Sequence, residues 1–233
     1  MKTILISGLL IALLFLCSCE KNTVEPERPV AGWNYFPVDV NNTWVYRVDS
    51  VVYSPFKKGQ IDTFVYWIKE WISEELSDDS SDAYVKIERQ SSHDSLRWQF
   101  ERNLSIRRNE SHAIRTDNNL PEVKLSFPLA LFKSWDANQF NNAGKKNYTY
   151  DWLFQPFSSG GVSYDSTISV TQEKIENFIQ SKLVREVYAR NKGMVYREFR
   201  NLNLEIITNP QTQKEDTTID GLKLTYKLVS FVR

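Results

Sequence analysis

The sequence predicts a mainly β protein with one antiparallel domain of roughly ten strands, arranged as a sandwich or as a sheet curled into a barrel, and with little helix. Three observations carry this prediction. Aromatic residues make up 13% of the chain, including 11 Tyr and 7 Trp, and such residues favour strands. From about Trp33 onward, apolar and polar residues alternate with a period of two. Turn residues separate these runs, and no linker rich in Pro or Gly divides them.

In the first half of the chain, alternation predicts five strands. They cover 44–53, 61–72, 83–89, 96–102 and 123–127. The residues 54–60, 74–82 and 91–95 are predicted as a turn, an acidic Ser-rich loop and a hairpin loop. The more polar segment 105–116 is predicted as an edge strand. Pro128 is expected to end the fifth strand, because proline cannot donate to a strand ladder.

The second half contains one irregular stretch, 129–142, where we expect a helical turn that holds Phe132, Trp135 and Phe140 over the core. Residues 173–179 have apolar positions spaced as in a helix. The remaining segments predict strands joined by hairpins. These strands cover 147–157, 162–171, 183–189, 194–199 with an extension over 203–208, and 222–232, and the turns or loops between them cover 158–161, 191–193 and 209–213.

Residues 1–18 are predicted to be a signal peptide. Lys2 precedes an apolar run from Ile4 to Leu16, which is shorter than the roughly 20 residues of a membrane-spanning helix. The four positions Leu16, Cys17, Ser18 and Cys19 resemble the lipobox of bacterial lipoproteins. That resemblance implies that signal peptidase recognises Leu16 and Ser18, that the chain is cut before Cys19, and that the Cys19 thiol carries acyl chains such as palmitate. An ordinary cleaved secretion signal or a short uncleaved anchor is the alternative.

Residues 19–32 are predicted to be a flexible tether between the lipid and the β-rich domain, 33–233. The segment is polar and charged and contains Pro26 and Pro29, which favours an extended, solvated chain. Two or more acyl chains hold a protein stably on a bilayer, whereas one chain does not. Cys17 and Cys19 are the two cysteines of the chain, so we expect the domain to depend on its hydrophobic core rather than on disulfides.

The charge balance and the local motifs exclude several classes of function. Lys and Arg together number 29, as do Asp and Glu, and no basic tract is present, so no nucleic-acid partner is predicted. The two histidines, His93 and His112, lie in polar, turn-like contexts. In the segment Ser92-His93-Asp94-Ser95, neighbouring side chains point apart, so they do not form a catalytic triad. No nucleotide-binding or hydrolase motif occurs.

No metal site, cofactor or catalytic residue is therefore assigned from the sequence. Asp78, Asp79 and Asp82 form an acidic group, but they lack the spacing and the glycine of a calcium loop. A carboxylate pair for glycan hydrolysis stays open, because such a pair is defined by separation in space and not by a local motif. The tryptophans either fill the core, which we predict, or line a groove. These tryptophans are Trp44, Trp67, Trp98 and Trp152.

Several three-residue segments resemble the O-glycosylation acceptor motif of exported Bacteroidetes-type proteins. Each begins with Asp, continues with Ser or Thr, and ends with an apolar residue or Thr. Four such triplets begin at Asp49, Asp94, Asp165 and Asp216. Ser95 and Thr217 are the better candidate acceptors, because both fall in predicted loops.

The segment 35–46, followed by 186–189 and 193–198, resembles a group of uncharacterised β-rich Bacteroidetes-type lipoproteins. The resemblance implies an outer-membrane location in the cell envelope and no catalytic residues. We expect a lipid-anchored envelope protein with a non-catalytic binding or structural role and a glycan or envelope-protein partner. The alternatives are a carboxylate-based glycan hydrolase and a periplasmic carrier of apolar cargo. A filled interior favours a structural role, an apolar cavity a carrier, and two facing buried carboxylates an enzyme.

Overall fold

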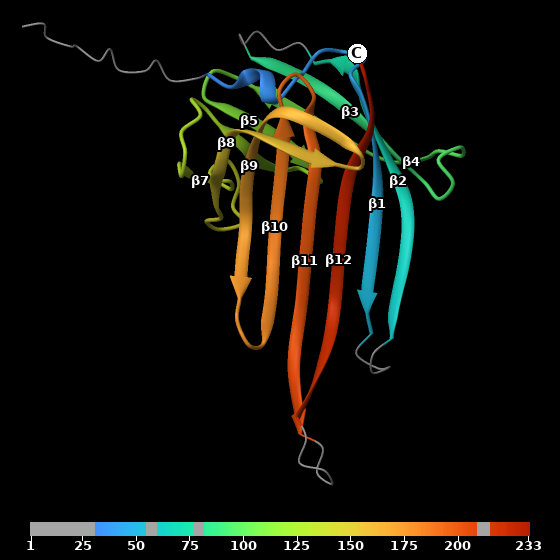
Figure 1. Cartoon of the computed structure of the whole chain (residues 1–233). Helices are drawn as coiled ribbons and strands as arrows, with labels where there is room; N and C mark the ends of the chain where they lie inside the picture. The colour runs from blue at the N-terminus through green and yellow to red at the C-terminus, as the bar shows by residue number, and fades with distance from the viewer. Residues whose placement is uncertain (1–30, 55–59, 77–81, 209–214) are drawn as a thin grey trace, which may run out of the picture.

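The computed structural model describes residues 31–54, 60–76, 82–208 and 215–233, and within these ranges it forms one 12-stranded sheet (Figure 1). Every neighbouring pair of strands is antiparallel. One 3-10 turn, η1 (Trp33–Tyr35), precedes the strands. No helix in the described ranges is long and apolar enough to cross a membrane. The strands are β1 (Thr43–Tyr53), β2 (Ile61–Glu75), β3 (Ala83–Ser92), β4 (Gln99–Arg108), β5 (His112–Asp117), β6 (Leu120–Ser126), β7 (Ser134–Asp136), β8 (Asn147–Ser159), β9 (Val162–Glu176), β10 (Gln180–Ala189), β11 (Gly193–Thr208) and β12 (Glu215–Val232).

The sheet consists of two six-stranded meanders, β1 to β6 and β7 to β12, which are joined by the pairing of the first strand with the last. The pairing of β1 with β12 runs from Thr43 opposite Val232 to Tyr53 opposite Gly221. Successive side chains in a strand point to opposite faces, so this register decides which residues face the interior. Trp44, Tyr46 and Val48 thereby face inward.

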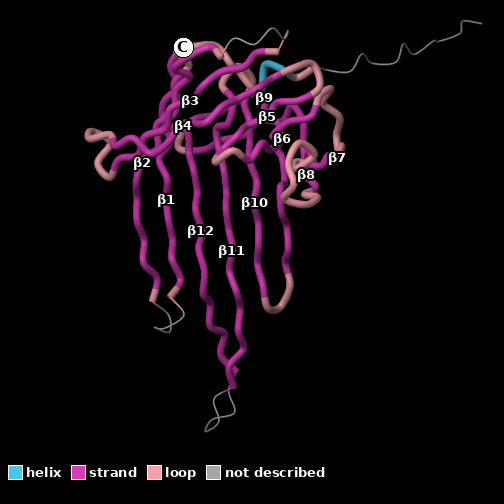
Figure 2. The backbone as a smooth tube through the Cα atoms, turned by 180° about the vertical axis from the view of Figure 1, so that it is seen from behind, coloured by secondary structure: helices cyan, strands magenta, loops and turns pink. Residues whose placement is uncertain are grey.

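The sheet nearly closes into a barrel, because its two edges, β6 and β7, lie next to each other (Figure 2). The backbone N–H of Val123 donates to the carbonyl of Ala137 at 2.8 Å. The indole N–H of Trp135 donates to the carbonyl of Val123 at 2.9 Å. The Tyr150 hydroxyl donates to the carbonyl of Ser126 at 3.0 Å and accepts from its N–H at 3.1 Å. Side chains therefore complete a seam that backbone pairing alone leaves open.

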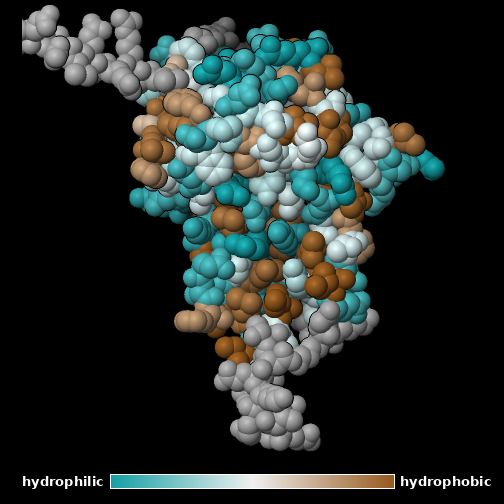
Figure 3. Space-filling view, in the orientation of Figure 1, coloured by the Kyte–Doolittle hydropathy of each residue, from teal (hydrophilic) through white to brown (hydrophobic). Residues whose placement is uncertain are grey.

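The long strands β9 to β12, β1 and β2 project beyond the barrel body (Figures 1 and 2). The β8–β9 hairpin folds over the outer face of these strands, where the rings of Phe157 and Tyr196 lie 5.4 Å apart. Figure 3 shows that hydrophobic side chains gather over the projecting ends. Exposed hydrophobic residues at these ends include Phe64, Val65, Phe178, Ile179, Ile206 and Ile219.

A single hydrophobic core fills the upper part of the barrel, and its members extend from Tyr35 to Leu228 along the chain. All members of this core follow Cys19 in the sequence. The fold class is confirmed: an antiparallel, barrel-like sheet. The described ranges contain twelve strands, where roughly ten were expected.

Two strands replace the single edge strand expected over 105–116. β4 continues to Arg108, and β5 begins at His112. Between them, the Asn109 side-chain oxygen accepts hydrogen bonds from the N–H groups of Ser111 and His112, at 2.9 and 2.7 Å. An Asn side chain that satisfies nearby backbone N–H groups stabilises a turn, which divides the polar segment in two. β4 itself begins at Gln99, three residues later than expected.

The helical turn expected in 129–142 does not form, and the helix-like spacing in 173–179 does not produce a helix. In 129–142 the structure forms the short strand β7, and although Trp135 is buried, Phe132 and Phe140 are 71% and 51% exposed. In 173–179 strand β9 continues to Glu176 and pairs with β10, because tertiary pairing overrides a local preference for helix. The predicted loops over 55–59, 77–81 and 209–213 lie outside the described residues.

Tyr150→Phe is expected to lower the free energy of unfolding by about 1–3 kcal/mol, because both backbone groups of buried Ser126 lose their partner. Urea denaturation of residues 20–233 measures this change. The matched variant Tyr164→Phe, in which the hydroxyl has no hydrogen bond among the described residues, is expected to change stability by less than about 0.5 kcal/mol. Equal losses in both variants would show that the seam does not depend on the Tyr150 hydroxyl.

Candidate functional site

The barrel encloses a cavity of about 570 Å³ between β1–β6 and β10–β12. One part of its wall is apolar and aromatic, with Phe36, Trp44 and Met194 among its members. The other part carries eight charged side chains from six different strands. These are Glu70, Arg89, Arg115, Asp117, Glu122, Lys124, Glu186 and Arg197.

The first charged group is the Glu70 cluster, which consists of Glu70 on β2, Arg89 on β3 and Arg115 on β5. Glu70 is 5% exposed. Arg115 donates to both oxygens of the Glu70 carboxylate, with one bond of 3.0 Å. Such a bidentate arrangement is among the strongest that a protein forms. Arg89 lies 3.6 Å from the Glu70 carboxylate and also forms an ion pair with Glu101 at 3.0 Å.

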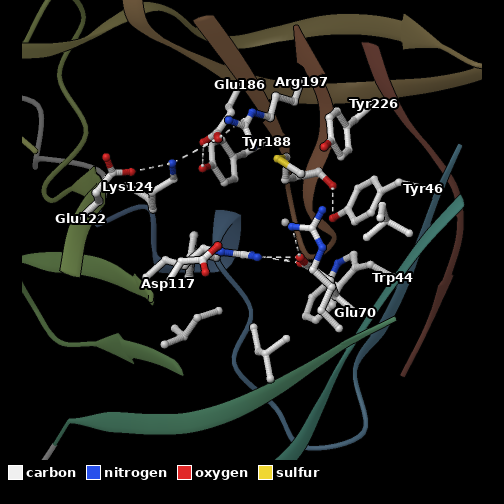
Figure 4. Close-up of a pocket in the computed structure, with 18 of the residues that line it drawn as sticks. Trp44, Tyr46, Glu70, Asp117, Glu122, Lys124, Glu186, Tyr188, Arg197 and Tyr226 are labelled. Atoms are coloured by element: carbon white, nitrogen blue, oxygen red, sulfur yellow. Dashed lines mark hydrogen bonds and ion pairs between the residues drawn. The ribbon is translucent and has the colours of Figure 1, made fainter. Parts of the chain in front are cut away.

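The second charged group is the Glu186 cluster, which consists of Glu122, Lys124, Lys146, Glu186, Tyr188 and Arg197. Figure 4 labels all of these residues except Lys146, which lies outside the cavity lining. Glu186, on β10, is 2% exposed. Its carboxylate accepts a hydrogen bond from the Tyr188 hydroxyl at 2.6 Å and lies 3.2 Å from Lys124 Nζ on β6. Arg197 Nε on β11 is 3.7 Å away. Lys124 also contacts Glu122, at 3.5 Å.

Both buried carboxylates are held in the ionised form. Burial alone would raise the pKa of Glu186, but the opposing charges of Lys124 and Arg197 lower it to about 2. The pKa of Glu70 is also lowered, because Arg115 and Arg89 outweigh the effect of burial. Burial and the nearby Glu186 carboxylate raise the pKa of the Tyr188 hydroxyl, which therefore stays protonated and donates. The site thus presents fixed charges rather than a proton donor of carboxylic type.

The described lining of this cavity contains none of the site residues predicted from the sequence. Leu16, Ser18 and Cys19 precede the described residues, so their roles stay predictions. Ser95 lies in the β3–β4 loop, as expected, with a φ of +62°. Thr217 lies in strand β12 rather than in a loop, opposite Ile206. The expectation of a loop there was wrong, because the β11–β12 hairpin extends further than the alternation indicated.

The structure separates the other candidate groups. His93 is exposed, and His112 contacts Gln139 at 3.1 Å. Asp78 and Asp79 lie outside the described residues, and among the described side chains no three or more His, Cys, Asp or Glu residues gather in a metal-binding arrangement.

Of the four tryptophans predicted to fill the core, Trp44 alone is in the buried cluster. Its indole N–H donates to the carbonyl of Lys192 at 2.6 Å, and its ring also borders the cavity. Trp67, Trp98 and Trp152 are partly exposed.

Sequence reasoning missed the charged residues of the cavity. One signal was present: an ionisable residue at an inward position between two apolar residues. Glu70 lies between Ile68 and Ile72, and Glu186 lies between Val184 and Tyr188. In a half-buried strand these positions share one face, so each carboxylate had to be buried with a partner.

The fold and the site together define an all-β, barrel-like protein with a charged internal cavity. In structure the chain is similar to a protein of Bacteroides fragilis described as exported and as having a YmcC-like fold, with 8% identity, a TM-score of 0.47, and coverage of 85% of this chain and 98% of that one. It is also similar to a protein of Parabacteroides distasonis described as a lipoprotein, with 10% identity, a TM-score of 0.40 and the same coverage. No family model and no curated protein sequence matches the chain.

Glu186→Gln is expected to lower the free energy of unfolding at pH 7 by about 3 kcal/mol, because Lys124 and Arg197 then lose a buried counter-charge. The pKa of Glu186 is depressed from 4.5 to about 2. Its contribution is therefore fully present above about pH 5 and is lost as the pH falls toward 2. The difference in the free energy of unfolding between the wild type and Glu186→Gln should therefore decrease as the pH falls from about 5 to 2. Urea denaturation at each pH measures this difference.

The control is Glu176→Gln, which breaks a surface pair with Arg200 in which the carboxylate is 55% exposed. Surface pairs contribute less than about 1 kcal/mol, so this variant should resemble the wild type at every pH. A gap between Glu186→Gln and the wild type that stays constant from pH 5 to 2 would contradict the assigned charge state of Glu186.

Proposed function

We propose that this chain is a lipid-anchored cell-envelope protein whose barrel cavity binds a small ligand without changing it chemically. The observation that carries the proposal is the 570 Å³ cavity with paired charges on its wall. Protein interiors are normally packed to the density of organic crystals. A cavity of this size falls in the range of ligand sites, and its mixture of apolar and charged walls suits a ligand that has both kinds of surface.

The charge states favour binding over hydrolysis. Glycoside hydrolysis needs one protonated carboxyl group as an acid, whereas the pKa values of Glu70 and Glu186 are both lowered. The described residues that line the cavity include no His, Ser or Cys side chain that could act as a nucleophile or a base. The glycan-hydrolase alternative therefore has no support in the cavity chemistry.

The other two alternatives are also distinguished by the interior. A purely structural role predicts a filled barrel, and a carrier of wholly apolar cargo predicts an apolar wall. The cavity fits neither expectation, because eight ionisable side chains line it. We infer a ligand with a polar group and an apolar part.

The anchoring part of the proposal rests on the lipobox-like residues. Acylated Cys19, reached after removal of residues 1–18, would hold the domain on the outer membrane through the tether, 19–32. The described chain enters at η1, at the end of the barrel opposite the projecting strand ends (Figure 1). A tethered domain could thus present those ends to a glycan or an envelope-protein partner. O-glycosylation of Ser95 and Thr217 belongs to the same proposal.

Cys19→Ser is expected to abolish the incorporation of labelled palmitate and to move the protein out of the membrane fraction. The matched variant Cys17→Ser should keep both properties, because Ser18 and Cys19 remain. The measurement is palmitate labelling combined with membrane fractionation of cells that express each chain. Unchanged labelling of Cys19→Ser would overturn the anchoring proposal.

The cavity is expected to bind one equivalent of the neutral apolar dye N-phenyl-1-naphthylamine, measured by dye fluorescence with residues 20–233. Leu120→Trp, at a cavity-lining position that is 40% exposed, should weaken the dye by severalfold because the larger ring occupies space in the cavity. Leu131→Trp, at a 52% exposed position outside the cavity lining, is the control and should bind as the wild type does. Absence of dye binding to the wild type would overturn the binding proposal.

A further inference from the structure

The charges around the cavity do not balance at one position. The Glu186 cluster contains three cations, Lys124, Lys146 and Arg197, but two carboxylates, Glu122 and Glu186. The other charged groups of the cavity wall are matched. Glu70 and Glu101 neutralise Arg89 and Arg115, and Asp117 pairs with Arg102.

The unmatched positive charge belongs to Arg197. Lys124 lies 3.2 Å from Glu186, and Lys146 lies 3.2 Å from Glu122, so each of these lysines has a close carboxylate. Arg197 reaches Glu186 through Nε at the longer distance of 3.7 Å. Its Nε is buried and makes no hydrogen bond. Its Cζ lies over the Tyr226 ring, 5.6 Å from the centroid. No described residue makes a hydrogen bond or an ion pair with its terminal nitrogens, so the N–H groups at the edge of this guanidinium are available to an anion.

An apolar row begins one inward position below Arg197. The strand register places Arg197 and Tyr226 opposite each other, and two residues further along β11 and β12 it pairs Phe199 with Leu224. Phe199 also pairs with Val184 on β10. On the other side, Leu224 pairs with Ser50 on β1, and Ser50 in turn pairs with Phe64 on β2. We define Val184, Phe199, Leu224, Ser50 and Phe64 as the inner row; Ser50, 7% exposed, is its one polar member.

The inner row continues the cavity onto the projecting strands. Arg197 and Tyr226 line the cavity, whereas Phe199 and Leu224 are half-buried and Phe64 is 57% exposed. Five neighbouring strands at a spacing of about 4.8 Å give the row a length of roughly 19 Å. That length accommodates a hydrocarbon chain of about a dozen carbons, and such a surface is stabilised when it is covered.

We propose that the cavity binds a singly anionic, single-chain amphiphile, with its carboxylate or phosphate on Arg197 and its hydrocarbon chain along the inner row. This inference rests on the proposed function and adds the chemical class of the ligand. One unmatched cation selects a single negative charge, since a second anion would lie beside Glu186. A cationic or zwitterionic amphiphile would bring a positive charge toward Arg197, Lys124 and Arg115.

The test is isothermal titration of residues 20–233 with dodecanoate below its micelle concentration. We expect one equivalent of dodecanoate to bind, with an affinity at least tenfold higher than that of dodecyltrimethylammonium. Dodecanoate should also bind more than about tenfold more tightly than octanoate, because each buried methylene adds favourable free energy. Arg197→Gln should weaken dodecanoate by about tenfold or more, since a charge-assisted contact is lost. Arg200→Gln, on the same strand but on the opposite face, should leave dodecanoate affinity unchanged.

Two further arms separate the sources of such a ligand. Lysophosphatidylglycerol presents the same charge on a phosphate, and tighter binding of it than of dodecanoate would assign a lipid headgroup rather than a free fatty acid. Equal binding of the cationic amphiphile, or no effect of Arg197→Gln, would overturn the inference. If N-phenyl-1-naphthylamine still binds in that case, the proposed binding function stands and only the ligand class fails. If neither probe binds, both proposals fail.

Discussion

The pairing of buried charges across the barrel interior is the constraint on which the rest of the structure depends. Lys124 on β6 belongs to the first meander and Glu186 on β10 to the second, so their contact joins the two halves of the sheet from the inside. The Glu70 cluster likewise connects β2, β3 and β5. Ionised groups cannot be buried alone, and they keep a hydrophobic core from filling this part of the barrel. The cavity is therefore a consequence of the charge pairs and not merely a packing defect.

The same register produces both the cavity and the surface that leaves it. Inward positions along β11 and β12 pass from Arg197 and Tyr226 to Phe199 and Leu224. The interior thus changes from charged to apolar over a distance of two residues. Strand length alone makes this possible, because β11 and β12 continue past the point at which β3 to β6 stop facing them (Figure 2). If all strands had ended where β3 to β6 end, the inward-facing surface would have stopped at the charged residues and would have had no apolar continuation.

Alternation in the sequence was sufficient to predict the fold class and most strands, because a period of two is visible wherever one face is buried. It failed where local side chains decide the backbone, as at Asn109. It left 173–176 undecided, because pairing with a neighbouring strand determines the structure there and local spacing does not. The spacing of Glu70 and Glu186 between apolar residues indicates buried charge, but it does not locate the cavity, because the adjacent Arg185 also lies between two apolar residues, Leu183 and Val187, and faces outward. Only the register of β10 against its neighbours makes that distinction. The residues near Cys19 show the reverse case, in which a short linear motif carries a prediction that the fold does not address.

The pairing of the first strand with the last has a consequence for the order in which the chain folds. The strands β1 to β6 can pair through local hairpins, but the edge of β1 stays unpaired until residues 221–232, near the other end of the described chain, have bound to it. Contacts of such high sequence separation form slowly, and an unpaired edge invites association with other chains. Chaperones that bind unfolded chains should therefore matter most for this protein in the interval between the formation of β6 and the pairing of β12 with β1.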